Sequence, residues 1–335
     1  MPSASHRPES APRRGASPRP DAVGRLRRFA VVLGAVCLGG SALLLAGCAP
    51  GTDPEKTRES LTEVTEAPTP AQAAEEYDAE THPDPIAEPI DCSPYLVITA
   101  RGTGEPSKGQ LVAAVATAVS AARPGEVETL DLDYPADTDV NEGGTRGARL
   151  LVDTLNVQHE ACPDQRFVLL GYSQGALVIG DALADPDARL VGGTVGEVDP
   201  GAADAIIAVV FYGDPRFVGS EEFNTGSFDP ALNGLLPRPV GALDAYADRI
   251  RDYCVAGDFV CQSSLELDEK PHVEYYKNGM PQDGAAFVIT RLGAPDPEAA
   301  KGAAEKDGKA AGGGTAGADV DVDADEPAAG KPQTE

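Results

Sequence analysis

Residues 166–183 read RFVLLGYSQGALVIGDAL, an apolar run interrupted in its middle by Gly-Tyr-Ser-Gln-Gly. The run predicts a buried strand, a tight turn and a helix from about residue 175, in the context that a G-x-S-x-G motif requires. Glycines two residues either side of Ser173 allow strand and helix to approach closely. Backbone N–H groups at the helix start favour negative charge developing beside the serine. G-x-S-x-G alone is common in ordinary turns, but this context makes Ser173 a candidate nucleophile rather than a turn residue.

A serine nucleophile needs a base, and the chain contains four histidines. In hydrolases with this motif the order along the chain is serine, acid, histidine. His6 and His82 lie in the N-terminal segments described below, and His159 precedes the serine. Elimination therefore leaves His272 as the base. A loop-capping role is the alternative, and it requires that Ser173 is also not a nucleophile.

Two carboxylates are candidates for the acid that orients the histidine. Asp214 directly follows the apolar run 205–213, at the position of a strand-end carboxylate. Asp258 lies in CVAGDFVC, between Cys254 and Cys261, a short loop that a disulfide would hold rigid. Such a fixed loop suits a carboxylate that must orient an imidazole. The residues by themselves leave both candidates open.

The middle of the chain alternates between strand-like and helix-like patterns. The strand-like runs are apolar throughout, which is typical of a parallel sheet covered by helices on both faces. The fold class is therefore α/β, with a central, mostly parallel sheet in three layers. Strands are expected at 95–100, 127–134, 166–172 and 205–213, and helices at 111–122, around 148–158 and at 176–184.

The chain begins with a basic segment followed by the apolar stretch FAVVLGAVCLGGSALLLAGC, Phe29 to Cys48. This is the layout of a secretory signal peptide. The stretch ends in Leu-Ala-Gly-Cys, which resembles the lipobox of bacterial lipoproteins, so Cys48 is predicted to carry lipid and become the new N-terminus. An uncleaved anchor and plain secretion are the alternatives, and Arg27-Arg28 leaves a twin-arginine export route open beside the general one. We expect an exported cell-envelope lipoprotein on the outer face of the cytoplasmic membrane, or a secreted protein.

Composition divides the rest of the chain. Residues 49–90 are rich in Pro, Glu, Thr and Ala, and residues 294–335 in Ala, Gly and acidic residues. Such segments bury too little apolar surface to offset the entropy of ordering, so we predict a disordered tether and a disordered tail. The predicted order is a signal peptide at 1–48, the tether at 49–90, a catalytic domain at 91–293 and the tail at 294–335.

Charge and cysteine content narrow the partners and the compartment. The formal net charge of -27 excludes the basic face that nucleic-acid binding needs. It also excludes electrostatic attraction of the folded part to anionic lipid, so any membrane contact is expected through the lipid anchor. Of six cysteines, Cys37 is expected to leave with the signal peptide and Cys48 is expected to carry lipid. The remaining four fit two disulfides outside the cytoplasm, for which the sequence permits three pairings.

Residues 91–293 resemble the cutinase family of serine esterases, including cutinase-like proteins of actinobacteria. The matching features are Cys162, eleven residues before Ser173, the GYSQGA stretch, the C-x-x-x-D-x-x-C loop, and a downstream histidine followed by a tyrosine. The resemblance implies a triad of Ser173, Asp258 and His272. It also implies the disulfides Cys92–Cys162 and Cys254–Cys261.

The same resemblance implies an oxyanion hole built from the backbone of Gln174 and from Thr103, the hydroxyl residue that follows Arg-Gly. Fungal members have serine at the position of Thr103, a change that keeps the hydroxyl. The segment 216–247 is long for a connection. Its apolar side chains either line an acyl pocket or cover the core: Phe217, Phe223, Phe228, Leu235 and Leu236.

The resemblance implies hydrolysis of lipid-like or polyester-like carboxylic esters through an acyl-enzyme, without a cofactor. We expect the protein to be a monomer. No cluster with metal-ligand spacing and no phosphate-cradling loop appears in the sequence. Two alternatives remain. The same triad serves acyl transfer or thioester cleavage, and a non-catalytic lipid-binding envelope protein could keep the fold without turnover.

Overall fold

The computed structural model describes residues 54–66, 71–263 and 266–312. The predicted signal peptide, with the lipidation candidate Cys48, lies outside the described residues. Among the helices that are described, none combines the length and the apolar character needed to cross a bilayer.

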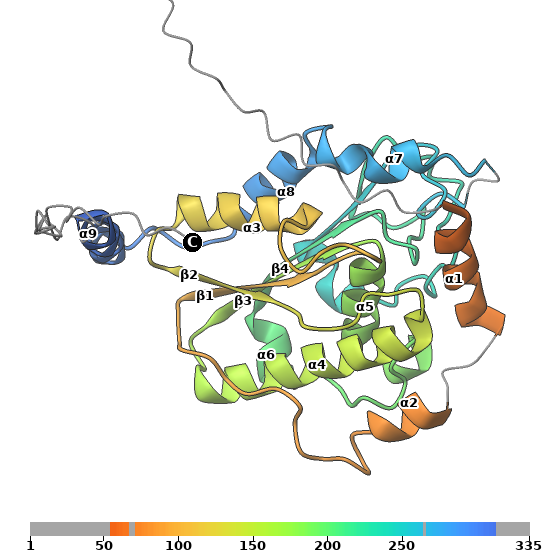
Figure 1. The fold of residues 1–335 in the computed structure, drawn as a ribbon, viewed down its shortest axis with the longest axis horizontal. Coiled ribbons are helices and arrows are strands. Elements are labelled where there is room, and N and C mark those ends of the chain that lie inside the picture. The colour runs from red at the N-terminus through yellow and green to blue at the C-terminus, as the bar shows by residue number, and fades with distance from the viewer. Residues whose placement is uncertain (1–53, 67–70, 264–265, 313–335) are drawn as a thin grey trace, which may run out of the picture. The chain divides into compact units, whose positions relative to one another are not determined.

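A single six-stranded sheet organises the described domain, and every strand pairing in it is parallel. The order across the sheet is β2-β1-β3-β4-β6-β5, so β3 lies between β1 and β4 near the middle (Figure 1). The central strands are buried along nearly their whole length, as expected for a parallel sheet covered on both faces. The strands are β1 Tyr95–Ala100, β2 Val127–Asp131, β3 Arg166–Tyr172, β4 Ile206–Tyr212, β5 Asn224–Gly226 and β6 Ile250–Cys254.

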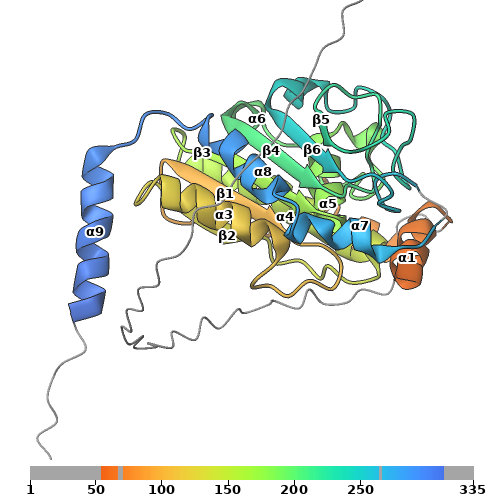
Figure 2. The ribbon, with the colours of Figure 1, turned by 90° about the horizontal axis from the view of Figure 1, so that it is seen from above.

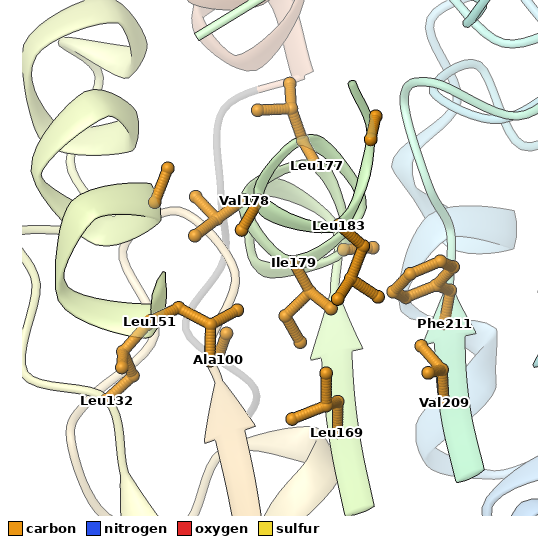
Figure 3. Close-up of a cluster of buried hydrophobic side chains, with 14 of the residues drawn as sticks. Ala100, Leu132, Leu151, Leu169, Leu177, Val178, Ile179, Leu183, Val209 and Phe211 are labelled. Atoms are coloured by element: carbon orange, nitrogen blue, oxygen red, sulfur yellow. The ribbon is translucent and has the colours of Figure 1, made fainter. Parts of the chain in front are cut away.

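Helices cover both faces of the sheet, which confirms the predicted three-layer α/β class (Figure 1). One layer contains α3 Leu111–Ala122 and α8 Met280–Ile289, and the other contains α4 Val140–Ala161, α5 Gln174–Leu183 and α6 Pro200–Ala205. Figure 3 shows how α5 is fixed on the sheet: Ile179 points toward Leu169 of β3, and Leu183 lies beside Phe211 of β4. Because α5 begins directly after β3, this packing fixes the position of the turn between them.

The observed elements differ from the predicted ones mainly at their ends. The helix expected around 148–158 extends over Val140–Ala161, because the Asp139 side chain accepts a hydrogen bond from the backbone N–H of Glu142 and caps an earlier start. The strand expected at 127–134 ends at Asp131. Strand β6 had no counterpart in the sequence prediction.

The long segment 216–247 covers the core. Phe223 and Leu236 belong to the cluster of buried side chains that contains α4 and α5 residues. Phe217 is fully buried against the disulfide of Cys254 and Cys261, with the Phe228 ring at 5.2 Å from its own. Of the two roles considered for these side chains, the structure supports covering the core.

The predicted disorder of 49–90 is wrong for much of that segment. Residues Pro54–Glu66 form helix α1 and Ala71–Glu76 form α2. The chain that follows is tied to α4 by the nearly buried guanidinium of Arg149, which donates to the carbonyl oxygens of Tyr77, His82 and Asp84. Long-range hydrogen bonds from one buried side chain therefore order this segment. Its own composition does not predict order, because the segment contains few apolar residues.

The predicted tail also begins with ordered structure. Residues Pro297–Gly312 form helix α9, and the rest of the tail lies outside the described residues. The Asp296 side chain accepts a hydrogen bond from the N–H of Glu298 at the start of this helix, and the Asp296 N–H donates to Glu126. The alanines and charged residues read as a disordered tail are also good helix formers, which explains the difference.

Candidate active site

Ser173 occupies a strained turn at the carboxyl end of β3. Its backbone has φ 53° and ψ -118°, a region that residues other than glycine rarely adopt. The Ser173 N–H donates to the carbonyl oxygen of Tyr212 at 2.9 Å, and the Ser173 carbonyl accepts from Ala176 and Leu177. A neighbouring strand and the first turn of α5 therefore hold the serine in this conformation.

The two glycines of the motif are required by close contacts. A Cβ on Gly171 would lie 2.8 Å from the Cα of Ala176, and a Cβ on Gly175 would lie 2.0 Å from the carbonyl oxygen of Ala100. Any larger side chain would push α5 away from β3 and β1. The geometry gives the reason for the sequence pattern on both sides of Ser173.

His272 lies on the short helix α7, Glu269–Val273, and faces the serine. Its Nε2 is 3.0 Å from the Ser173 Oγ, and its Nδ1 is 3.0 Å from each carboxylate oxygen of Asp258. The Tyr172 ring stacks on the imidazole at 5.1 Å, and the Tyr172 hydroxyl donates to the His272 carbonyl at 2.8 Å. These contacts fix both the plane and the depth of the imidazole ring.

Asp258 is fully buried in the loop that the Cys254–Cys261 disulfide closes. Its carboxylate accepts hydrogen bonds from the Val260 N–H at 2.9 Å and from the Tyr275 hydroxyl at 2.7 Å. Burial, together with the Asp258 charge, raises the pKa of Tyr275 well above its ordinary value, so the phenol remains a donor. Sequence reasoning did not assign Tyr275 a role, although its place one turn beyond His272 was a usable signal.

The alternative acid, Asp214, faces a different set of groups. Its carboxylate accepts from the Arg216 N–H at 2.8 Å and forms an ion pair with the buried Arg238 guanidinium. Arg216 also pairs with Asp181, so Asp214 belongs to a buried cluster of ions behind the site. The structure brings Asp258, and not Asp214, to the imidazole.

The loop that carries Thr103 lies against the start of α5. The Thr103 hydroxyl donates to the Gln174 side-chain oxygen at 3.1 Å, which brings the two predicted oxyanion residues together. The buried carboxyl of Glu105 holds this loop, accepting from the Gly102 N–H at 2.7 Å, from the Leu111 N–H at 2.8 Å and from the Tyr276 hydroxyl. Desolvation raises the pKa of Glu105, and the hydrogen bonds that it accepts oppose this shift.

The cysteine pairing agrees with the pairing implied by the family resemblance. Cys92 bonds to Cys162, and Cys254 bonds to Cys261. The first disulfide joins the segment before β1 to the end of α4, and the second closes the loop of Asp258. The Cys92–Cys162 disulfide therefore fixes the segment before β1 to α4, and the Cys254–Cys261 disulfide restrains the loop that carries the Asp258 carboxylate.

A family model described as Cutinase matches residues 91–292. The chain belongs to the cutinase family. Among curated proteins, an acetylxylan esterase of Hypocrea jecorina is 32% identical over 150 residues, covering 44% of this chain and 47% of the relative. A cutinase of Kineococcus radiotolerans is 31% identical over 200 residues, covering 59% of this chain and 61% of the relative. The chain thus spans about half and about three-fifths of these two relatives.

A solved structure shares the cutinase-family fold with this chain. The catalytic core domain of acetyl xylan esterase from Trichoderma reesei has 29% sequence identity and a TM-score of 0.51. The match covers 60% of this chain and 100% of the solved domain. Helix α1 precedes the residues that the family model matches.

Proposed function

We propose that this protein is a serine esterase that hydrolyses carboxylic esters through an acyl-enzyme. The observation that carries the proposal is the line of contacts from the Ser173 Oγ to the His272 Nε2 and from the His272 Nδ1 to Asp258, each at 3.0 Å. A hydroxyl becomes a useful nucleophile only when a base stands within hydrogen-bond reach and is itself oriented.

In the proposed reaction His272 takes the proton of Ser173 as the Oγ attacks the ester carbonyl carbon. Asp258 keeps the Nδ1 proton in place and stabilises the imidazolium that forms. The Gln174 N–H donates to the oxyanion, and the Thr103 hydroxyl does so by turning from the Gln174 side-chain oxygen. The negative charge of the oxyanion also lies at the start of α5. The protonated His272 then gives its proton to the leaving alcohol, and a water activated by the same base hydrolyses the acyl-enzyme.

A panel of p-nitrophenyl esters of increasing acyl length tests the proposed activity and its substrate class. We expect turnover with an initial burst of p-nitrophenol, because the acyl-enzyme accumulates when deacylation is slower than acylation. The names of the relatives, cutinase and acetylxylan esterase, support carboxylic esters as the substrate class. Absence of turnover across the whole panel from a folded protein would leave the lipid-binding alternative in place.

We further propose that the protein is exported, that residues 1–48 are its signal peptide and that residues 91–293 are its catalytic domain. The two disulfides support export, because such bonds persist outside the reducing cytoplasm. The Leu-Ala-Gly-Cys motif at the end of the apolar stretch supports anchoring by lipid at Cys48.

Lipidation predicts that Cys48→Ser changes the location of the protein. The wild-type protein is expected in the membrane fraction with an acylated N-terminal Cys48, and the variant is expected as an unprocessed precursor or in the soluble fraction. Fractionation followed by mass spectrometry of the N-terminal peptide measures this, with Cys37→Ser as the matched control. A mature N-terminus at any other residue would contradict the assignment.

A further inference from the structure

Helix α1 lies at the edge of the sheet where the candidate site is found. Figures 1 and 2 both place α1 beside α7, the helix that carries His272. Ser173 follows the carboxyl end of β3 at this same edge. Residues 54–66 precede the family match, so α1 is an addition to the matched domain.

One face of α1 is buried against the domain. The buried positions follow the spacing i, i+3, i+4 and i+7 of a single helical face: Thr57, Ser60, Leu61 and Val64. Leu61 and Val64 are 1% and 4% exposed and belong to the same core cluster as Leu177. Figure 3 shows the α1 ribbon beside Leu177. Helix α1 packs mainly against α4, the helix beside α5, and Leu177 lies one turn of α5 beyond Ser173.

The outer face of α1 reaches the segment that leads to the base. A surface hollow there is lined by five residues of α1 and by Leu267: Glu55, Arg58, Glu59, Thr62 and Glu63. Leu267 lies two residues before the start of α7 and is 41% exposed. The helix therefore shares a buried cluster with the element that follows Ser173 and a surface hollow with the segment that precedes His272.

Ser173 and His272 are each only 3% exposed with α1 in this position. An ester must bring its carbonyl carbon to about 3 Å from the Oγ, so a segment at this edge of the sheet has to move. Helix α1 buries four side chains, of which only Leu61 and Val64 are apolar, and a helix of 13 residues is marginal by itself. The position of α1 therefore depends on its contacts with the domain and not on its own helical stability.

We propose that α1 is a lid that closes the entrance to Ser173 while Leu61 and Val64 are buried against the domain. An ester enters when α1 detaches and these two side chains become exposed. This rests on the proposed esterase function and adds the device that controls access to it. If the lid is open one-tenth of the time or less, every substrate that needs it open reacts about tenfold more slowly or worse.

The test compares two double variants of the full chain. Leu61→Asp with Val64→Asp places two charges on the buried face, where an unpaired charge opposes docking. Thr62→Asp with Thr65→Asp adds the same charge at exposed positions of the same helix and serves as the control. We expect kcat/KM for a p-nitrophenyl ester, and the rate of labelling by an active-serine phosphonate, to rise about tenfold or more in the first variant alone. Equal or lower rates in a folded first variant would overturn the lid.

A second readout is independent of catalysis. The chain contains no tryptophan, so Leu267→Trp introduces a single fluorescent reporter beside α1. The lid predicts a red shift of its emission when Leu61→Asp and Val64→Asp are added. No shift is expected with Thr65→Asp alone, which is the control here because Thr62 lines the same hollow as Leu267. A shift without any gain in rate would show that α1 detaches without gating the site, which contradicts the proposal. Wild type and both variants all inert toward ester and phosphonate would instead overturn the esterase function itself.

Discussion

Ser173→Ala is expected to lower kcat for ester hydrolysis by about a millionfold, and His272→Ala by a similar factor, as for removal of the nucleophile or base of other serine hydrolases. The two residues act as one unit through the contact at 3.0 Å between Nε2 and Oγ. Removing both should therefore cost little more than removing either. Initial rates on a short p-nitrophenyl ester measure the effect.

His159→Ala is the matched control for the histidine variant. His159 lies in the last turn of α4, away from the carboxyl edge of the sheet, and should be dispensable for turnover. Thermal unfolding of each variant separates loss of chemistry from loss of fold. Near wild-type turnover in a folded Ser173→Ala or His272→Ala protein would refute the assignment of the nucleophile or the base.

Asp258→Asn is expected to lower kcat by about ten-thousandfold while the protein remains folded. An amide can donate to Nδ1, which favours the tautomer that leaves Nε2 protonated and unable to act as a base. The Val260 N–H and the Tyr275 hydroxyl both donate to the Asp258 carboxylate. In the variant one of the two carboxylate oxygens is replaced by an amide NH2, which cannot accept a hydrogen bond. Steady-state kinetics on the ester panel, with the fold checked by circular dichroism, provide the measurement.

Asp214→Asn is the control for this variant. It should lower the stability of the protein and leave the activity of the folded protein largely unchanged. It removes the partner of the buried Arg238 guanidinium, and breaking a buried ion pair typically costs about 3–5 kcal/mol of stability. Protein that remains folded should keep most of its activity, because Asp214 is turned toward the arginines. An essential Asp214 beside a dispensable Asp258 would move the acid to the end of β4.

The central part of the fold could be predicted because local pattern and tertiary environment agree there. Strands β1, β3 and β4 are almost entirely apolar and buried on both faces, so composition alone identifies them. Strand β6, IRDYC, contains the buried Asp252 and two other polar side chains, and it gives no such signal. Burial raises the pKa of Asp252 well above its usual range, with the Asp214 charge adding to the shift, and no pattern of residue types reveals this.

The candidate site was predictable for the residues that a motif contains and not for those that support them. Ser173 follows from strand, turn and helix, and His272 from chain order, whereas Asp258 needed the family resemblance. Tyr275 is set by packing around the imidazole. Helix α1 was missed because its buried face is half polar, so its two apolar side chains do not stand out from acidic surroundings.

The most direct test that Ser173 is the nucleophile is labelling with an active-serine phosphonate, followed by peptide mapping of the adduct. The triad predicts one adduct per chain, located on Ser173, and a loss of ester turnover in proportion to the labelled fraction. The same reagent should fail to label the His272→Ala protein, because the serine hydroxyl then has no base. An adduct on another residue, or full turnover after Ser173 is stoichiometrically labelled, would contradict the proposed esterase mechanism.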